Sequence, residues 1–440
     1  MTSRAPLLSC DDTLPSQSAR PIVTPGVIPS ATPSVSHDRL LAATDQCVKC
    51  GLCLPHCPTY RLRRDEAESP RGRIALVQGL ITGALAPSPR LDAHLASCLG
   101  CRACETVCPS LVAFGEILDQ TRARRVEALP AWRRHLRLAW LRGLASPRVM
   151  HLAQRLASLY RMSGLARLAR GLGLARLRGL GAYDRLADGL KPPPRWSPSP
   201  EVGGDVALFL GCVSEVAQPR ALEAAELVLR HLGFAPVRPV GQTCCGAMLR
   251  HNGFPDQADA LLERNGRALA GVPVVGLASA CVAELRTGPG LTQVQELCAF
   301  LDQATWPDGL FLNPLEADVL VHTPCSHRHP LGGTEAVHRL LGRIPGLRLA
   351  ELPDNALCCG AAGTYLLQQP NTAAELLAPK IAHLGRLRPR FLVTTNTGCA
   401  LHLAAGLREA GLAIEVCHPV ELIARQWHGT GTHPGRLLRP

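Results

Sequence analysis

Short apolar runs alternate with amphipathic stretches through the second half of the chain. The runs Val206–Gly211 and Val272–Leu277 have the length of strands, and a helical pattern occupies Arg220–Leu232 between them. The same order returns around the runs Asp318–His322 and Phe391–Thr395. Because strands that alternate with helices are typical of parallel sheets, we predict an α/β unit in each copy.

Cysteines repeat together with these strands. Each copy has one cysteine after its first strand, an adjacent pair before a glycine, and one cysteine after a later strand: Cys212, Cys244, Cys245 and Cys281, then Cys325, Cys358, Cys359 and Cys399. From 212 to 244 is 32 positions and from 325 to 358 is 33, while 245 to 281 is 36 and 359 to 399 is 40. The pattern indicates an internal duplication. Since parallel strands end at a common edge, we expect the four thiols of each copy to meet there.

These eight repeated cysteines are candidate metal or redox ligands. Adjacent cysteines suit a site in which two metals share neighbouring thiols, whereas free cysteine is often just a small buried apolar residue. Duplication of the whole set favours the metal interpretation. Histidines near the ends of two predicted strands are candidates to tune or ligate a metal, or are ordinary polar residues. Three lie around Cys325 and one follows Cys399: His322, His327, His329 and His402. The remaining cysteines fit no pattern and are interpreted as structural or incidental: Cys10, Cys298 and Cys417.

The N-terminal third carries the most specific pattern. Two runs of four cysteines share one spacing and a trailing proline: Cys47, Cys50, Cys53 and Cys57, then Cys98, Cys101, Cys104 and Cys108. In this spacing three thiolates wrap one 4Fe–4S cubane and the fourth reaches the partner cluster. We therefore predict a first cluster on Cys47, Cys50, Cys53 and Cys108, and a second on Cys98, Cys101, Cys104 and Cys57. Structural zinc is the alternative. However, a zinc site needs only four thiols in two pairs and does not call for two full runs of four cysteines, each followed by a proline.

The cellular setting follows from composition. The chain of 440 residues holds 19 cysteines, but residues 1–36 lack the apolar core of a signal peptide, and no apolar run reaches the length of about 18 residues that spans a membrane. We therefore expect reduced thiols in the cytoplasm.

Positive charge is concentrated in one segment. The net charge is +12, and between Ala131 and Leu190 twelve arginines face only two acids, Asp184 and Asp188. We expect helices in this segment, broken at its glycines: 143, 164, 171, 173, 179 and 181. A solvated amphipathic helix face is the first interpretation of this segment. Binding to an anionic lipid surface is the next, because leucine, Trp132 and Trp140 interleave with the arginines. Nucleic acid is not an expected partner, since no recognised binding module occurs. We expect a cytoplasmic protein that lies peripherally on the inner face of the cell membrane.

The predicted domain organisation follows these changes of pattern. We expect a tail, a two-cluster region, a basic helical connector with a proline-rich linker at its end, two cysteine-rich units and a second tail: residues 1–36, 37–125, 126–200, 201–310, 311–427 and 428–440. The predicted fold class is thus multidomain α+β and α/β, with an N-terminal helical, ferredoxin-like domain that holds two clusters, followed by duplicated α/β cysteine-rich units.

With both cysteine runs and both CCG repeats, the chain resembles the iron–sulfur subunit of bacterial glycolate oxidase (glycolate dehydrogenase). Three segments add to the resemblance: residues 70–74 (PRGRI), 357–365 (LCCGAAGTY) and 397–402 (TGCALH). It covers roughly residues 38–425, and extends more distantly to the cysteine-rich repeats of heterodisulfide reductases and lactate-utilisation proteins.

The resemblance implies an electron-transfer subunit. A separate FAD-binding chain oxidises glycolate to glyoxylate, and its electrons pass singly through two 4Fe–4S clusters to a membrane acceptor such as quinone. No flavin-binding glycine motif occurs in this chain, so no catalytic residue is expected on it. The alternatives are an equivalent subunit for D-lactate, glycerol-3-phosphate or a heterodisulfide, and a membrane-recruiting scaffold with merely structural clusters.

One departure from the heterodisulfide reductase pattern concerns the end of each repeat. Those enzymes finish the repeat with Cys-x-x-Cys, whereas Glu284 and His402 occupy the last position here. The fifth thiol is therefore missing from both repeats, so a catalytic noncubane cluster of that kind is not expected.

Overall fold

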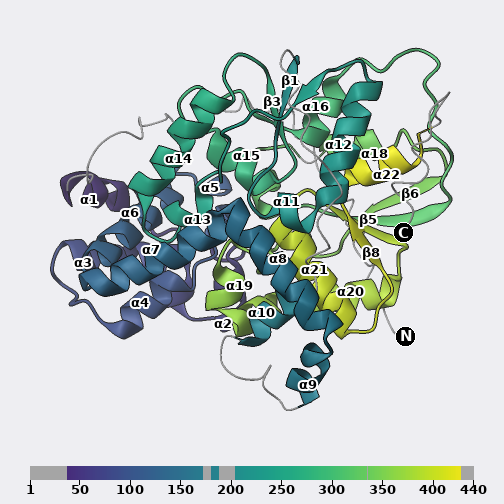
Figure 1. Ribbon diagram of the computed structural model, residues 1–440. Coiled ribbons are helices and arrows are strands. Elements are labelled where there is room, and N and C mark those ends of the chain that lie inside the picture. The colour runs from purple at the N-terminus through teal and green to yellow at the C-terminus, as the bar shows by residue number, and fades with distance from the viewer. Residues whose placement is uncertain (1–36, 172–179, 188–203, 334, 428–440) are drawn as a thin grey trace, which may run out of the picture.

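The computed structural model describes residues 37–171, 180–187, 204–333 and 335–427. The two predicted tails and the proline-rich linker at 191–200 lie outside the described residues. The described chain forms a helical N-terminal region, a set of connecting helices and two α/β units (Figure 1).

The N-terminal region is built from short helices around the cysteine loops: α1 (His37–Asp45), α2 (Pro58–Arg63), the 3-10 helix η1 (Glu66–Glu68), α3 (Pro70–Ile81), α4 (Pro89–Ala96), α5 (Ala103–Thr106) and α6 (Phe114–Glu127). Its small core joins Leu40 of α1, Val77 of α3 and Ile117 of α6. Four of the thiols pack against this core, so the core and the cysteine loops support each other: Cys47, Cys98, Cys104 and Cys108.

The basic connector is helical, as predicted: α7 (Ala131–Ala145), α8 (Pro147–Met162), α9 (Leu165–Gly171) and α10 (Leu180–Ala187). The prediction of a break at Gly143 is wrong, because this glycine lies inside α7. The chain breaks instead at Ser146, which lies between the two helices and caps α8. Pro147 cannot donate a backbone hydrogen bond and therefore begins the next helix rather than continuing the last.

The first α/β unit runs from β1 to α16: β1 (Val206–Phe209), α11 (Ser214–Ala217), α12 (Pro219–His231), β2 (Pro236–Val237), α13 (Ala247–Arg250), α14 (Pro255–Ala268), β3 (Val274–Gly276), α15 (Ser279–Leu285), β4 (Gln295–Glu296) and α16 (Leu297–Gln303). Its four strands are parallel, in the order β2-β1-β3-β4. The central strand β1 is buried along its whole length, as expected of a sheet covered on both faces.

The second unit runs from β5 to α22: β5 (Ala317–His322), α17 (Cys325–Arg328), α18 (Glu335–Leu341), β6 (Leu347–Glu351), α19 (Tyr365–Gln368), α20 (Pro370–Leu387), β7 (Phe391–Thr394), α21 (Thr397–Glu409), β8 (Glu415–Cys417) and α22 (Pro419–Arg425). Its strands are again parallel, in the order β6-β5-β7-β8. The two units therefore share one topology, which confirms the predicted parallel sheets and explains the sequence repeat.

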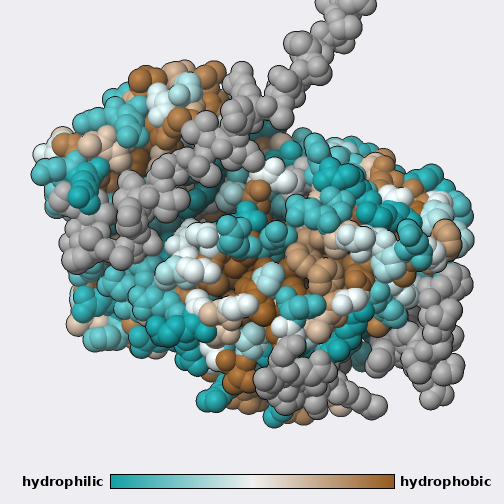
Figure 2. All heavy atoms as spheres, turned by 90° about the horizontal axis from the view of Figure 1, so that it is seen from above, coloured by the Kyte–Doolittle hydropathy of each residue, from teal (hydrophilic) through white to brown (hydrophobic). Residues whose placement is uncertain are grey.

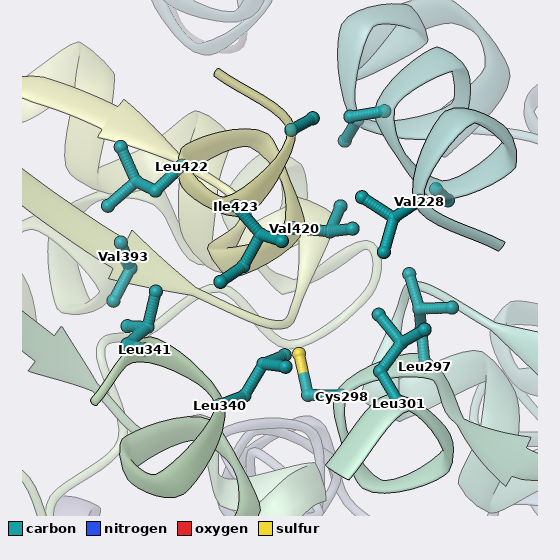
Figure 3. Close-up of a cluster of buried hydrophobic side chains, with 14 of the residues drawn as sticks. Val228, Leu297, Cys298, Leu301, Leu340, Leu341, Val393, Val420, Leu422 and Ile423 are labelled. Carbon is teal, nitrogen blue, oxygen red and sulfur yellow. The ribbon is translucent and has the colours of Figure 1, made fainter. Parts of the chain in front are cut away.

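The two units share one hydrophobic core. Helix α12 packs on α22, and their counterparts α18 and α16 pack on each other, so the units are related by an approximate twofold axis. Figure 3 shows side chains of both units meeting there, among them Val228, Leu301, Leu340 and Ile423. Burial of this apolar surface holds the units together as one body.

The outer surface shows no broad apolar belt on the face drawn in Figure 2, where hydrophobic side chains gather in small groups among hydrophilic ones. Within the described part of the chain, none of the helices combines the length and the apolar composition needed to cross a bilayer.

Candidate metal centres

The first cysteine run forms a loop between α1 and α2. Cys57 ends the loop at the N-cap of α2, where Pro58 occupies the first helical position. Cys57 is buried and Cys50 is exposed. Burial raises the pKa of the Cys53 thiol, and the neighbouring charges of Cys47 and Cys57 raise it further. The three thiols therefore lie near enough for their charges to act on one another.

The second run folds around α5. Burial raises the pKa of the Cys104 thiol well above its ordinary value, and Cys101 and Cys98 add to the effect. Cys57 of the first run also raises the pKa values of Cys101 and Cys104. Cys57 therefore lies near enough for its charge to act on two thiols of the second run.

These two loops fit thiolate-bound metal. Without a cation, crowded and partly buried thiols hold their protons, because neighbouring thiolates would repel one another. A bound metal displaces the protons and compensates the charge. A donor set made only of cysteine suits iron–sulfur clusters or zinc, and the two four-cysteine runs match the cluster spacing.

A buried arginine braces the first loop, a role that no sequence pattern indicated. Arg73 is 1% exposed and forms an ion pair with the buried carboxylate of Glu68. Its Nη1 donates to Thr59 Oγ1 at 3.1 Å and lies 4.0 Å from Cys57 Sγ. His94 Nδ1 meets the other oxygen of Glu68 at 2.7 Å. The PRGRI segment thus places a fixed positive charge beside a candidate ligand.

The four thiols of the first unit meet at the carboxyl edge of its sheet, as predicted. Cys212 Sγ lies 3.3 Å from Cys244 Sγ, and Cys245 contacts both Cys244 and Cys281. The hydrogen bond with Cys244, followed by burial, raises the pKa of Cys212 well above its ordinary value.

The second unit repeats this arrangement and adds a histidine. Cys325 Sγ lies 3.9 Å from Cys358 Sγ, and Cys359 contacts Cys399. A ring nitrogen of His322 and the sulfurs of Cys359 and Cys399 all lie within 4.8 Å of one another. Burial, followed by the charges of Lys380 and Arg328, lowers the pKa of His322 well below its ordinary value, so the ring is neutral.

The glycine of each CCG segment has a backbone role. Gly246 and Gly360 have φ values of +98° and +92°, which L side chains rarely adopt. A Cβ on Gly360 would also lie 2.7 Å from the carbonyl oxygen of Ala373, and one on Gly246 would lie 3.1 Å from that of Ala258. Only glycine lets the CCG segment approach α14 in the first unit and α20 in the second this closely.

The other candidate histidines have different partners. His327 Nδ1 lies 2.8 Å from Thr395 Oγ1, and His402 Nε2 lies 3.1 Å from the carbonyl oxygen of Ala373. His329 Nδ1 lies 3.3 Å from Thr106 Oγ1 in the N-terminal region. Of the four histidines named from the sequence, His322 is the one that joins a group of metal-binding atoms in the described residues.

Two unassigned cysteines lie in the shared core. Cys298 and Cys417 are both buried there, which agrees with a structural role, and Cys10 lies outside the described residues. Cys298 also groups with Glu296 and His418. However, His418 Nδ1 accepts from the backbone nitrogen of Val420, and its Nε2 faces the carbonyl oxygen of Leu277 at 3.3 Å. Both ring nitrogens are engaged, so this group is not a suitable metal site.

The second cysteine run adjoins the second unit. Leu99 and Cys101 share a hydrophobic cluster with Cys358, Cys359 and Cys399. Tyr365 of the second unit also donates to the carbonyl oxygen of Ser97 at 3.0 Å. The candidate site of the second unit therefore lies directly beside the N-terminal cysteine loops.

Family models match three parts of the chain. A 4Fe–4S dicluster domain matches residues 43–112, and a cysteine-rich domain matches residues 206–286 and again 319–404. These ranges contain both four-cysteine runs and both repeated sets.

Comparison with known proteins identifies similar chains along most of this length. The glycolate oxidase iron–sulfur subunit of Escherichia coli is 29% identical, and a Bacillus subtilis protein named "Probable glycolate oxidase iron-sulfur subunit" is 28% identical, each over 86% of this chain and 92% of the relative. One subunit of a fumarate reductase (CoM/CoB) from Methanothermobacter marburgensis is 30% identical over 50% of this chain and 46% of its own length.

Proposed function

Because this chain is a homologue of glycolate oxidase iron–sulfur subunits, we propose that it is the electron-transfer subunit of a flavin-dependent glycolate dehydrogenase complex. The observation that carries the proposal is the joint occurrence of a dicluster domain and two cysteine-rich domains in a chain that aligns with 92% of those relatives. Oxidation of glycolate to glyoxylate belongs to an FAD-binding partner chain.

The proposed ligands follow the cysteine spacing. One 4Fe–4S cluster takes Cys47, Cys50, Cys53 and Cys108, and the other takes Cys98, Cys101, Cys104 and Cys57. Cys57 raises the pKa values of Cys101 and Cys104, which supports its assignment as a ligand of the second cluster rather than the first. Such clusters carry single electrons, which suits a flavin that receives two electrons as hydride and passes them on one at a time.

The chain's own residues shape this relay. Arg73 holds positive charge near Cys57, and the apolar side chains of the N-terminal core support the cysteine loops from one side. Cysteines of both runs pack with the same small core, which fixes the two ligand sets close to each other. A short, fixed separation is what single-electron transfer between two sites requires.

We further propose that the subunit lies on the membrane surface, where quinone is the expected acceptor. Helices α7–α9 contain nine arginines and no carboxylate between Ala131 and Gly171. Leu152, Leu156 and Leu159 of α8 are each more than half exposed and lie on one helix face. Helix α8 packs on α11 through another face, so these leucines can enter a lipid interface among the arginines (Figure 1).

The proposal is tested on the complex purified anaerobically with its flavin partner. We expect about eight irons per chain from the two dicluster sites, and glycolate should reduce the clusters within turnover time. The matched variant Cys50→Ser removes an exposed ligand and should stop electron flow while the partner stays bound.

The outcomes separate the alternatives. Colourless protein that holds only zinc would refute the proposal. Reduction by D-lactate, glycerol-3-phosphate or a thiol pair, but not by glycolate, would move the chain to a sister complex; relatives named "Lactate utilization protein A" match half of this chain. If no substrate reduces the clusters, the chain would instead be a scaffold whose clusters are merely structural.

A further inference from the structure

The two cysteine-rich units can be compared position by position because the same hydrogen bonds frame their sites. In the first unit, Gln242 accepts from the backbone nitrogen of Leu210 at 2.9 Å and donates to the carbonyl oxygen of Leu208 at 3.3 Å. In the second unit, Asn355 accepts from Thr323 at 2.8 Å and donates to Val321 at 3.0 Å. Because the same hydrogen bonds occur in both units, a residue that differs at an equivalent position marks a chemical difference between the two cysteine sites.

The first difference lies three residues before the leading cysteine. The first unit has Phe209 at this position and the second has His322. His322 is 2% exposed, and its Nδ1 lies 2.9 Å from Thr394 Oγ1. This contact orients the ring, and a ring nitrogen of His322 lies within 4.8 Å of the sulfurs of Cys359 and Cys399. Since Thr394 engages Nδ1, Nε2 is the nitrogen left to bind a metal. A histidine held through one nitrogen is the usual arrangement for binding metal through the other.

The second difference lies ten residues after the proline that starts the next helix. Asn265 of the first unit corresponds to Lys380 of the second. Lys380 is 1% exposed, and its Nζ donates to the carbonyl oxygen of Asp354 at 2.9 Å. A buried ammonium is costly unless negative charge lies near it. The thiols of Cys358, Cys359 and Cys399 and the carboxylate of Asp354 are the neighbours whose charge acts on this lysine. Three of these four groups are thiols, which suits an anionic, thiolate-rich site.

The two units also differ in which part of the molecule lies beside their thiols. Leu99 and Cys101 of the second cysteine run pack into the same cluster as the second unit's thiols. The first unit's thiols pack instead with Ala145, Leu262 and Val282, and no cysteine of either run belongs to that cluster in the described residues. The second unit is therefore the one in position to exchange an electron with the dicluster region.

We propose that the second unit holds a redox-active iron–sulfur cluster of mixed ligation, with Nε2 of His322 as a ligand beside Cys325, Cys358, Cys359 and Cys399. One histidine and four cysteines offer five donors, which exceed the four that a single tetrahedral zinc takes, and adjacent cysteines suit two or more irons. The inference rests on the proposed dicluster assignment. An electron from the partner's flavin first reduces the second dicluster site. That site is then oxidised again as it passes the electron to this cluster.

The experiment detects the nitrogen ligand directly. The chain is produced in cells fed histidine that carries the heavy nitrogen isotope, isolated anaerobically and reduced with dithionite. Pulsed electron paramagnetic resonance should show strong coupling of a histidine nitrogen to one cluster signal. His322→Phe, which copies Phe209, should abolish this coupling and release the iron beyond the eight or so of the dicluster sites. His322→Cys should keep that iron and lose the coupling.

The control acts at the equivalent position of the first unit. Phe209→Leu should leave both the coupling and the iron content unchanged. The proposal is overturned if wild-type protein shows no strongly coupled histidine nitrogen, if the coupling survives in His322→Phe, or if the second unit contains zinc. The labelled wild-type spectrum decides the matter even if His322→Phe fails to fold. Dithionite replaces the substrate, so failure here is distinct from failure of glycolate to reduce the dicluster sites.

Discussion

Gly360 is a position in the second cysteine-rich unit where the backbone conformation and the lack of space both require glycine. Its φ of +92° and the 2.7 Å approach that a Cβ would make to Ala373 act together. We predict that Gly360→Ala lowers the free energy of unfolding by about 2–4 kcal/mol. Gly411→Ala is the control, because Gly411 has a φ of +66° but open space around it, so it should cost only about 1 kcal/mol. Anaerobic thermal unfolding of both variants measures the difference, and equal losses would contradict the steric argument.

Arg73 gives a second prediction at this scale. Arg73→Met leaves the Glu68 carboxylate buried with His94 as its remaining ionisable partner. We expect a loss of about 3–5 kcal/mol, typical of breaking a buried ion pair. Arg348→Met removes an ion pair on the exposed edge strand β6 and should change stability little. Denaturant unfolding compares the two, and a loss in Arg73→Met no larger than in this control would contradict the assignment.

Residue identities were predicted best where spacing alone defines the chemistry. The cysteine runs and the CCG segments were visible because their ligands are close in sequence. His322 was only one of four candidate histidines, and Lys380 was not suspected, because their neighbours come from β7 and from the segment that carries Cys358 and Cys359. Contacts between residues far apart in sequence decide such roles.

The bounds of the elements predicted in the duplicated half agree with the structure to within two residues. The predicted strand 272–277 is β3 at Val274–Gly276, and the predicted helix 220–232 is α12 at Pro219–His231. Buried apolar strands and helix-starting prolines give clear signals there. The break at Gly143 was misplaced because a single glycine near a helix end is tolerated when the helix remains hydrogen-bonded.

The exposed face of α8 yields a prediction at the scale of the element. The chain should bind vesicles that contain phosphatidylglycerol and not neutral phosphatidylcholine vesicles, and raising salt from about 0.1 to about 0.5 M should release it. Leu156→Glu should weaken binding at least tenfold, because it places a carboxylate in the proposed lipid contact. Leu387→Glu alters an equally exposed leucine of α20 and should have no effect. Co-sedimentation measures both, and binding that ignores salt would refute the membrane role.

Glu296 links pH to the stability of the whole molecule. It lies between the units with Cys298 beside it, His327 and His418 each 3.9 Å away, and Arg286 near. Burial raises the pKa of Glu296 to about 8. The folded state therefore keeps a proton that the unfolded state has released above about pH 4.5, so stability falls as pH rises through this window and levels off above about pH 8.

We predict that Glu296→Gln, which cannot ionise, removes this pH dependence. Its stability relative to the wild type should rise by roughly 1 kcal/mol per pH unit between about pH 5 and pH 8. Glu409→Gln changes a half-exposed carboxylate on α21 and should keep the wild-type slope. Melting temperatures across this range provide the measurement, and parallel curves for the wild type and Glu296→Gln would contradict the assignment.

The arrangement of the units could not be predicted from the sequence. Periodicity identified two similar halves, but nothing in it indicated that α12 would pack on α22 and α16 on α18. It also gave no sign that Cys101 would lie beside the second unit rather than the first. Both facts depend on complementary surfaces formed only after each half has folded.

The approximate twofold axis through the shared core has a consequence for ancestry. Each unit carries both halves of the interface, since α12 and α16 of one meet the counterparts of α16 and α12 in the other. A chain with one unit would therefore pair with its own copy, and fusion of two such genes would turn that homodimer into a single polypeptide. Once joined, the two halves would be free to differ, and they do: one has a histidine and a lysine where the other has a phenylalanine and an asparagine.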